Sequence, residues 1–427
     1  MPPVAPAVAG TAARPPAGSG RSPGRRRGSR SSGDIRSLRR AAGRPAGLRA
    51  ALEQRGLAFE FGYTLDRFAV ARGGLDQRSG RLEDLDLGLR MDSGQLAGWR
   101  GAIVRPRVLE NRGGSPATAA GDAQVIDNID APADCRLYEA WLCQSWDEDR
   151  GSVLAGLYDL NGEFDALTTS ALFLNGAHGM GSEFAQSGRN VPSVFPTTAL
   201  ALRARTRIGR GFGLQAAALD GVPGDPDDPG AMHVRFHHED GALLVAQTDW
   251  TQDETDSPGS RSGRLFAGAW HYTGCFGAGG DDEAYPLYWP GSSGVYAAAE
   301  GLLRRSVACP TRELAGGVRL GVADDAVNRF DSYLGAGLVC TGPWRSRAED
   351  RLGVAVAIAH NGVDFPGARR AQGYPVDRAE MALEASYQVR VTPWLALQPD
   401  VQWIVSPDTN PGTPNALALG MRTRLSF

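Results

Sequence analysis

Apolar and polar residues alternate along most of this chain from Leu57 onward. In LAFEFGYTLD, which begins at Leu57, every second residue is apolar or aromatic up to Leu65. The same period of two recurs in residues 85–91, 198–208, 351–360, 381–391 and 394–405. Successive side chains of a strand point to opposite faces of its sheet. Each of these segments is therefore predicted to be a strand with one apolar and one polar face.

The chain ends inside the same pattern. Met421, Leu425 and Phe427 occupy alternate positions of the last segment, and Arg422 and Arg424 lie between them. Terminal residues of ordinary domains usually fray in water. A strand closed by an aromatic looks instead like the recognition signal of bacterial outer-membrane barrels. We therefore expect Phe427 to be a membrane-assembly signal for the barrel-assembly machinery, on a strand that pairs with the first strand.

Two architectures produce such alternation: a soluble sandwich or barrel with an apolar interior, and a membrane barrel with an apolar exterior. The polar faces mix Arg, Asp, Glu and Gln with Gly and Ala, which suits a wet lumen. Long and short connections alternate, and the count of about sixteen strands lies in the range of membrane barrels. The prediction is an all-β, transmembrane antiparallel β-barrel embedded in outer-membrane lipid. In its strand near 351–360, Val356 should face lipid and Ala357 the lumen.

Composition and charge narrow the classes of protein to which the chain can belong. The chain has 427 residues with 56 Gly, and no apolar run approaches the roughly 18 residues that a membrane helix needs. Its net charge of −3 gives no case for nucleic acid as a partner. The five cysteines are scattered and lack a CxxC pair, so neither a zinc site nor a complete disulfide framework is expected. We expect no metal and no cofactor.

The first 42 residues are a different kind of sequence. Residues 1–42 are rich in Arg, Pro, Gly and Ser, and such a segment should be disordered. They lack the apolar run of a secretory signal, so we interpret them as a mis-started or damaged leader, with a basic tail as the alternative. The stretch GLRAALEQRGL (47–57) predicts a short helix before the barrel, which we assign to residues 43–56. The barrel is then expected over residues 57–427.

Several long motifs resemble the carbohydrate-selective porins of the OprB family. They are LAGLYDLNGEFD (154–165), LFLNGAHGMGSEFAQSGRNVPSVFP (172–196) and LQAAALDGVPGDPDDP (214–229), together with residues 47–64, 96–102 and 379–407. The resemblance runs in order from about residue 43 to the end, and departs in the first 42 residues, where the family has an export signal. It implies an outer-membrane porin for facilitated diffusion of small neutral sugars such as glucose. Whether the barrels are monomers or homotrimers stays open.

The resemblance also implies a pore constriction, because the third outer loop of large porins folds into the barrel. Its expected residues are Asn161, Glu163, Asp165, Asn175, Glu183, Gln186, Arg189 and Asn190 of the loop, Arg203, Arg205 and Arg207 of the next strand, and Arg105 and Arg107 of an earlier strand. Arginine keeps its charge and presents several donors in a planar fork. Facing carboxylates in a narrow passage, such groups can exchange hydrogen bonds with sugar hydroxyls, whereas ions of either sign meet a like charge.

Other interpretations compete with this one. The inward charges can simply line the wall of a general-diffusion porin without sugar preference. Glu163 and Asp165 could be the carboxylate pair of a secreted all-β glycosidase or carbohydrate-binding protein, but many polar loops contain such a pair, so no catalytic residue is expected. His233, His237 and His238 lack dependable metal-ligand spacing. Aromatic residues near predicted strand ends are expected to anchor the membrane interface, although one or two could instead stack on a sugar ring in the pore. They are Trp270, Tyr272, Tyr285, Tyr288, Trp289, Trp344, Trp394 and Trp403.

Overall fold

The computed structural model describes most of the chain beyond its first 44 residues. The described residues are 45–209, 211–225, 239–252, 262–277, 288–306, 311–363, 365, 369, 373 and 375–427. The segment predicted to be disordered, residues 1–42, lies outside them, as do Cys309, the three histidines of 233–238 and Tyr285. The side chains of Tyr288 and Trp289 are likewise outside the described part.

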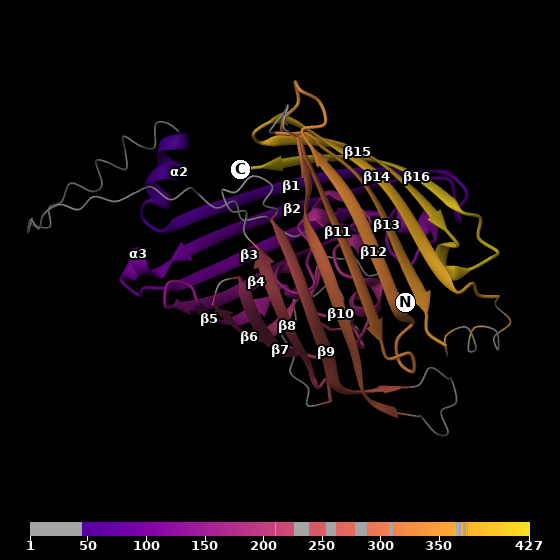
Figure 1. Ribbon diagram of the computed structural model, residues 1–427, viewed down its shortest axis with the longest axis horizontal. Coiled ribbons are helices and arrows are strands. Elements are labelled where there is room, and N and C mark those ends of the chain that lie inside the picture. The colour runs from indigo at the N-terminus through magenta and orange to yellow at the C-terminus, as the bar shows by residue number, and fades with distance from the viewer. Residues whose placement is uncertain are drawn as a thin grey trace, which may run out of the picture.

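Sixteen antiparallel strands close into one barrel, which confirms the predicted fold class (Figure 1). The strands are β1 Leu57–Arg72, β2 Ser79–Asp92, β3 Ala102–Gly113, β4 Asp134–Trp146, β5 Gly151–Tyr158, β6 Ala199–Ile208, β7 Phe212–Asp220, β8 Ala242–Gln252, β9 Gly263–Gly277, β10 Tyr288–Arg305, β11 Glu313–Ala323, β12 Phe330–Thr341, β13 Arg351–Asn361, β14 Ala379–Thr392, β15 Leu395–Val405 and β16 Ala416–Ser426. Each strand pairs with its neighbours in sequence, and β1 pairs with β16.

Short helices flank the strands at the rims. Helix α2 (Pro45–Glu53) precedes β1, α3 (Ser93–Ala97) lies between β2 and β3, and the 3₁₀ turn η4 (Pro407–Thr409) lies between β15 and β16. Asp92 caps α3 by accepting hydrogen bonds from the backbone N–H groups of the first turn. No helix in the described part of the chain is long and apolar enough to cross a bilayer.

The chain end forms the seam of the barrel. Gly62 on β1 lies opposite Ser426 on β16, and Phe427 exchanges two backbone hydrogen bonds with Phe61. The Phe427 ring stacks on Trp394 with centroids 6.0 Å apart and also contacts Phe61 at 5.6 Å. Closure pairs the backbone groups that an open edge strand would leave free.

The two faces of the wall differ as the alternation predicted. Large apolar side chains on the outer face are exposed, among them Leu202, Leu214, Leu320 and Val354. The inner face is only partly wet, however. Ala357 points inward but is 0% exposed, because it packs in a cluster with Leu174 and Ala177. The expectation that Ala357 faces an open lumen is therefore wrong, since a connecting segment covers this part of the inner wall.

Four cysteines lie in the described part of the chain, and each is a free thiol. They are Cys135, Cys143, Cys275 and Cys340.

Candidate functional site

Two connections bend into the barrel and pack against its inner wall. We call residues 114–133, between β3 and β4, loop 2, and residues 159–198, between β5 and β6, loop 3. Loop 2 contains α4 (Ala117–Ala120). Loop 3 contains η1 (Leu160–Gly162), η2 (Thr169–Leu172), η3 (Gly176–His178) and α5 (Ser182–Ala185). Asp159 and Asn175 begin two of these turns, because their side chains accept from the backbone N–H groups of Asn161 and Ala177.

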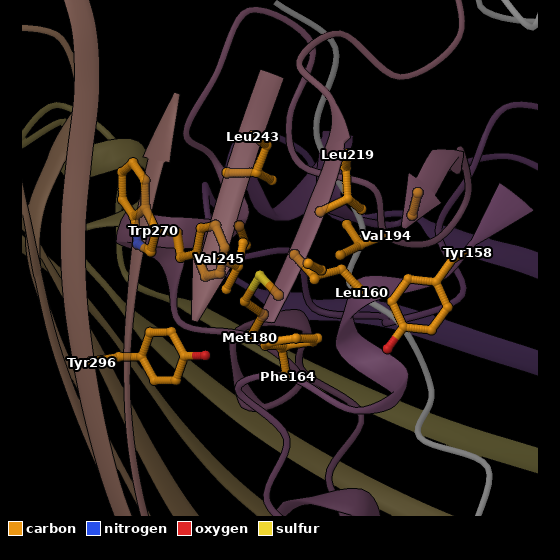
Figure 2. Close-up of a cluster of buried hydrophobic side chains, with 14 of the residues drawn as sticks. Tyr158, Leu160, Phe164, Met180, Val194, Leu219, Leu243, Val245, Trp270 and Tyr296 are labelled. Atoms are coloured by element: carbon orange, nitrogen blue, oxygen red, sulfur yellow. The ribbon is translucent and has the colours of Figure 1, made fainter. Parts of the chain in front are cut away.

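Apolar side chains anchor loop 3 to strands β8 to β10 (Figure 2). The Phe184 ring stacks on Trp270 with centroids 5.0 Å apart and planes 6° apart, and its centroid lies 6.0 Å from that of Tyr296. Trp270 and Tyr272 are each 2% exposed. The prediction that these two residues anchor the membrane interface is therefore wrong: they face inward, and burial against the loop outweighs their amphipathic character.

Two glutamates of β14 hold both loops by their backbones. Glu384 accepts hydrogen bonds from the N–H groups of Leu174 (2.6 Å) and Asn175 (2.9 Å) in loop 3. Four residues earlier, Glu380 accepts from the N–H groups of Ala123 (2.8 Å) and Gln124 (2.9 Å) in loop 2. Each carboxylate thus accepts hydrogen bonds from two successive backbone N–H groups. Without an acceptor, such donors would destabilise the folded protein. Strand β14 therefore positions loops 2 and 3 together.

The two loops also contact each other. The Asn128 N–H donates to the Leu174 carbonyl at 2.8 Å, and the Gly176 N–H donates to the Val125 carbonyl at 2.7 Å. Gln402 on β15 joins both loops, because its amide nitrogen donates to the Ile126 carbonyl and its amide oxygen accepts from Asn175. The loops consequently form one inner layer rather than two independent flaps.

His178 lies within this layer without forming an ion pair. Its Nε2 atom is 3.7 Å from a carboxylate oxygen of Glu384, and both side chains are buried. Burial lowers the pKa of His178 to about 4, so the imidazole is neutral at physiological pH. Its ring packs against Phe173 with centroids 5.0 Å apart. His178 is therefore a packing residue of loop 3.

An arginine on the opposite wall binds two acids of loop 3. The Arg319 guanidinium on β11 donates to both carboxylate oxygens of Asp165, at 2.9 and 2.6 Å, and to Glu183 at 2.6 Å. All three residues are no more than 4% exposed. A buried bidentate contact fixes the relative orientation of the two side chains and also pairs their opposite charges. This contact fastens loop 3 to the barrel wall opposite β3 to β6.

Another acid of loop 3, Glu163, faces the other side of the barrel. Glu163 binds Arg203 on β6 at 2.7 and 2.9 Å and accepts from the Tyr158 hydroxyl at 2.7 Å. Arg205 approaches the same carboxylate at 3.9 Å. The side chains of Glu163 and Arg205 are 26% and 35% exposed, so both still reach solvent.

A second charged group lies on the inner faces of β1 to β4. Arg107 binds both oxygens of Asp86, at 2.8 and 2.6 Å, and Glu139 at 3.3 Å. Arg105 binds Glu60 at 2.6 Å and approaches Glu139 at 3.7 Å. The side chains of Arg105 and Arg107 are 27% and 17% exposed. Opposite charges thus alternate on a solvent-accessible strip of the inner wall.

The predicted constriction residues fall into three environments. Buried in contacts within loop 3 or between this loop and the wall are Asn161, Asp165, Asn175, Glu183 and Arg203. Partly exposed are Glu163, Gln186, Asn190, Arg205, Arg105 and Arg107. Exposed are Arg189, which lies near Glu239 and Asp240, and Arg207. The predicted constriction is thus divided between buried residues, partly exposed residues of loop 3, β3 and β6, and two exposed arginines.

Sequence reasoning missed loop 2, Arg319 and the two β14 glutamates. The inward direction of Arg319 could have been predicted from its neighbours. Val318 and Leu320 are apolar residues of the outer face, so the charged residue between them must face inward. Glu380 and Glu384 carry the same signal. Loop 2 carries a weaker one in VIDNID, where Ile126 and Ile129 are apolar residues in a connection that should otherwise be polar.

A closed sixteen-strand barrel with inward loops and a charged inner strip defines a channel-forming porin rather than an enzyme. Residues 77–427 match the family described as carbohydrate-selective porin, OprB family. The chain therefore belongs to the OprB family of carbohydrate-selective porins, as its motifs had suggested.

Individual relatives are distant but cover most of the chain. Porin B of Pseudomonas aeruginosa is 24% identical over 414 residues, which span 89% of this chain and 90% of that protein. The high-pH structure of Pseudomonas putida OprB has a TM-score of 0.79 at 22% identity and covers 90% of this chain and 97% of its own. The low-pH structure of the same protein has a TM-score of 0.58 at 18% identity, with coverages of 90% and 96%. These structures share the fold of this chain.

Proposed function

We propose that this porin lies in the bacterial outer membrane and passes small neutral sugars of glucose-like size by facilitated diffusion. The observation that carries the proposal is the paired character of the accessible charges. Glu163 lies with Arg203 and Arg205, and Arg107 lies between Asp86 and Glu139. A sugar hydroxyl can both donate to a carboxylate and accept from a guanidinium.

Such a strip distinguishes neutral sugars from ions by charge and by hydrogen bonding. A neutral polyol replaces lost water contacts with donors and acceptors of the wall, whereas a cation or an anion always meets fixed charges of its own sign. Passage also requires release, which a few partly exposed hydrogen bonds permit. In this proposal, Glu163, Arg205, Arg105 and Arg107 contact solute, while the buried Asn161, Asp165, Asn175 and Glu183 shape the constriction.

The test of this function combines sugar permeation with ion selectivity. We expect Arg203→Ala plus Arg205→Ala to raise cation preference in planar-bilayer recordings, because Glu163 loses its counter-charges. The same variant should weaken block of the current by glucose, since the partly exposed Arg205 no longer donates to the sugar and Glu163 loses the arginines that position it. Wild-type channels in liposome-swelling assays should admit monosaccharides much faster than larger sugars.

A matched control removes two exposed arginines, Arg100 and Arg345, which lie in turns at the end of the barrel opposite loops 2 and 3. Arg100→Ala plus Arg345→Ala should leave both readouts at wild-type levels. If the pore variant also keeps wild-type ion selectivity and glucose block, the β6 arginines merely line the wall. Swelling rates that fall smoothly with solute size, with no preference for sugars over other neutral solutes, would favour a general-diffusion porin.

Assembly provides a second prediction. We propose that Phe427 is read by the barrel-assembly machinery and completes the seam with Phe61 and Trp394. Deleting Phe427 removes two aromatic pairs, each worth about 0.5–1.5 kcal/mol beyond area burial, and two backbone hydrogen bonds with Phe61. The yield of heat-modifiable barrel in the outer membrane should fall several-fold. Phe427→Tyr should preserve it, and an unchanged yield after deletion would contradict the assembly role.

A further inference from the structure

Three arginines interrupt the apolar outer face of the barrel on β1 to β3. Arg67 on β1 is exposed and lies on the outer face, because its neighbours Asp66 and Phe68 are buried on the inner face. Arg81 on β2 and Arg112 on β3 are exposed to 53% and 67% of their side-chain area. Elsewhere the outer face presents residues such as Leu202, Leu214, Leu320 and Val354.

Arg67 and Arg81 are direct cross-strand partners. Opposite residues on one face of an antiparallel pair have Cβ atoms about 4.5–5.5 Å apart, and like charges there are destabilising. Arg81 also binds Glu83 at 2.7 Å, whereas Arg67 forms no ion pair within the described part of the chain. An anion placed between the two guanidinium groups would relieve the repulsion and satisfy the free donors of Arg67.

The position of Arg67 and Arg81 along the barrel axis indicates the source of the anion. Arg67 lies six residues beyond Phe61, the contact of the terminal Phe427, which is about 20 Å along the strand and about 15 Å along the barrel axis for a strand tilted by about 40°. Arg81 lies ten residues from Met91 at the other end of β2, which is about 25 Å along the axis by the same reasoning. The apolar band of such barrels is about 25 Å tall. The pair thus lies in the half of this band that is farther from Phe427, and long arginine side chains can extend from there to the headgroups of the outer leaflet.

We propose that Arg67 and Arg81, with Arg112 beside them, bind a phosphate group of an outer-leaflet lipid headgroup. Guanidinium forks match phosphate oxygens in geometry and charge, and remain charged near apolar surroundings. Glu83 is held by the Tyr63 hydroxyl at 2.5 Å as well as by Arg81, and Glu110 pairs with Arg112. These two acids orient the arginines and leave one net positive charge for the ligand. The inference rests on the proposed outer-membrane location, but not on sugar transport.

The test uses the full chain, folded in a neutral detergent, and diphosphoryl lipid A as the probe. Arg67→Gln plus Arg81→Gln should bind lipid A roughly tenfold more weakly in native mass spectrometry, because charge-assisted hydrogen bonds are lost. Lipid A should also raise the thermal midpoint of the wild type more than that of this variant. Arg67→Lys plus Arg81→Lys keeps the charge and should retain an intermediate affinity.

Arg100→Gln plus Arg345→Gln is the matched control, since it removes the same charge from the opposite rim and should bind lipid A like the wild type. Lipid A lacking both phosphates should bind both proteins equally weakly. Equal lipid A affinity of the Arg67/Arg81 variant and the wild type would overturn the proposal. An equal stabilisation by sodium phosphate would indicate a free-anion site instead. A dimer that the variant abolishes, without any loss of lipid binding, would assign the patch to a second copy of the chain.

Lipid binding in detergent needs no transport, so the two proposals fail separately. A protein that binds lipid A but does not swell sugar-loaded liposomes would contradict the proposed transport alone. A protein that swells sugar-loaded liposomes but does not bind lipid A would contradict the lipid site alone. Heat-modifiable migration verifies that each variant is folded before its affinity is compared.

Discussion

Replacing Arg319 with methionine should release loop 3 from the β11 wall and widen the channel. Arg319 is the shared counter-charge of Asp165 and Glu183, and all three are buried. Removing one partner of a buried ionic contact typically costs about 3–5 kcal/mol, because the remaining charges stay desolvated. We expect single-channel conductance to rise in bilayer recordings, and sugars larger than monosaccharides to enter liposomes.

A compensated variant separates the charge from the packing. Arg319→Met combined with Asp165→Asn and Glu183→Gln removes all three charges while keeping similar volumes. Replacing a whole buried ionic group in this way is often nearly neutral, so conductance should return close to the wild-type value. If Arg319→Met alone has wild-type conductance and sugar cut-off in a folded barrel, loop 3 does not depend on this contact. The β14 glutamates and the Phe184 cluster would then hold it sufficiently.

Introducing arginine at Val356 should strongly reduce the stability of the barrel in lipid. Val356 lies at the centre of β13 on the outer face, between the buried inward residues Ala355 and Ala357. An arginine on the lipid face costs about 2–4 kcal/mol at the bilayer midplane. We expect a lower yield of folded protein in vesicles and a lower temperature for conversion to the unfolded gel band.

Val356→Met is the control, because methionine has a similar length without the charge and should fold like the wild type. Similar behaviour of the arginine and methionine variants would mean that β13 does not face hydrocarbon there. Ala357→Arg cannot serve as a lumen-facing control. Its position is packed under loop 3, so a large side chain would overpack the inner layer instead of entering water.

The membrane barrel itself could be predicted from the sequence because its signal is local. Alternation at period two is visible within each strand, from Leu57 to Phe427, and every strand repeats it without needing information about its neighbours. Turn-rich connections between the strands then imply closure of successive hairpins. The same local signal correctly placed Arg203 and Arg205 on the inner face of β6.

The site was predicted less completely because its contacts join distant segments. Loop 3 was expected inside the barrel from the family resemblance, but nothing local indicates that Asn175 meets Gln402, 227 residues away. The same holds for Glu384, whose carboxylate receives the backbone of loop 3 across 210 residues. Five residues predicted to form the constriction, among them Asp165 and Asn175, are consequently buried.

The sequence by itself determined which face of each strand is apolar, that the strands close into a membrane barrel, and which family the chain resembles. Only the tertiary structure decided which inward residues meet water. Inward direction follows from the backbone of a single strand, whereas exposure depends on whatever lies across the lumen. Arg319 and Arg105 both point inward, yet loop 3 covers the first, because Asp165 and Glu183 of the loop bind its guanidinium. Arg105 instead pairs with Glu60 on the neighbouring wall and stays partly accessible.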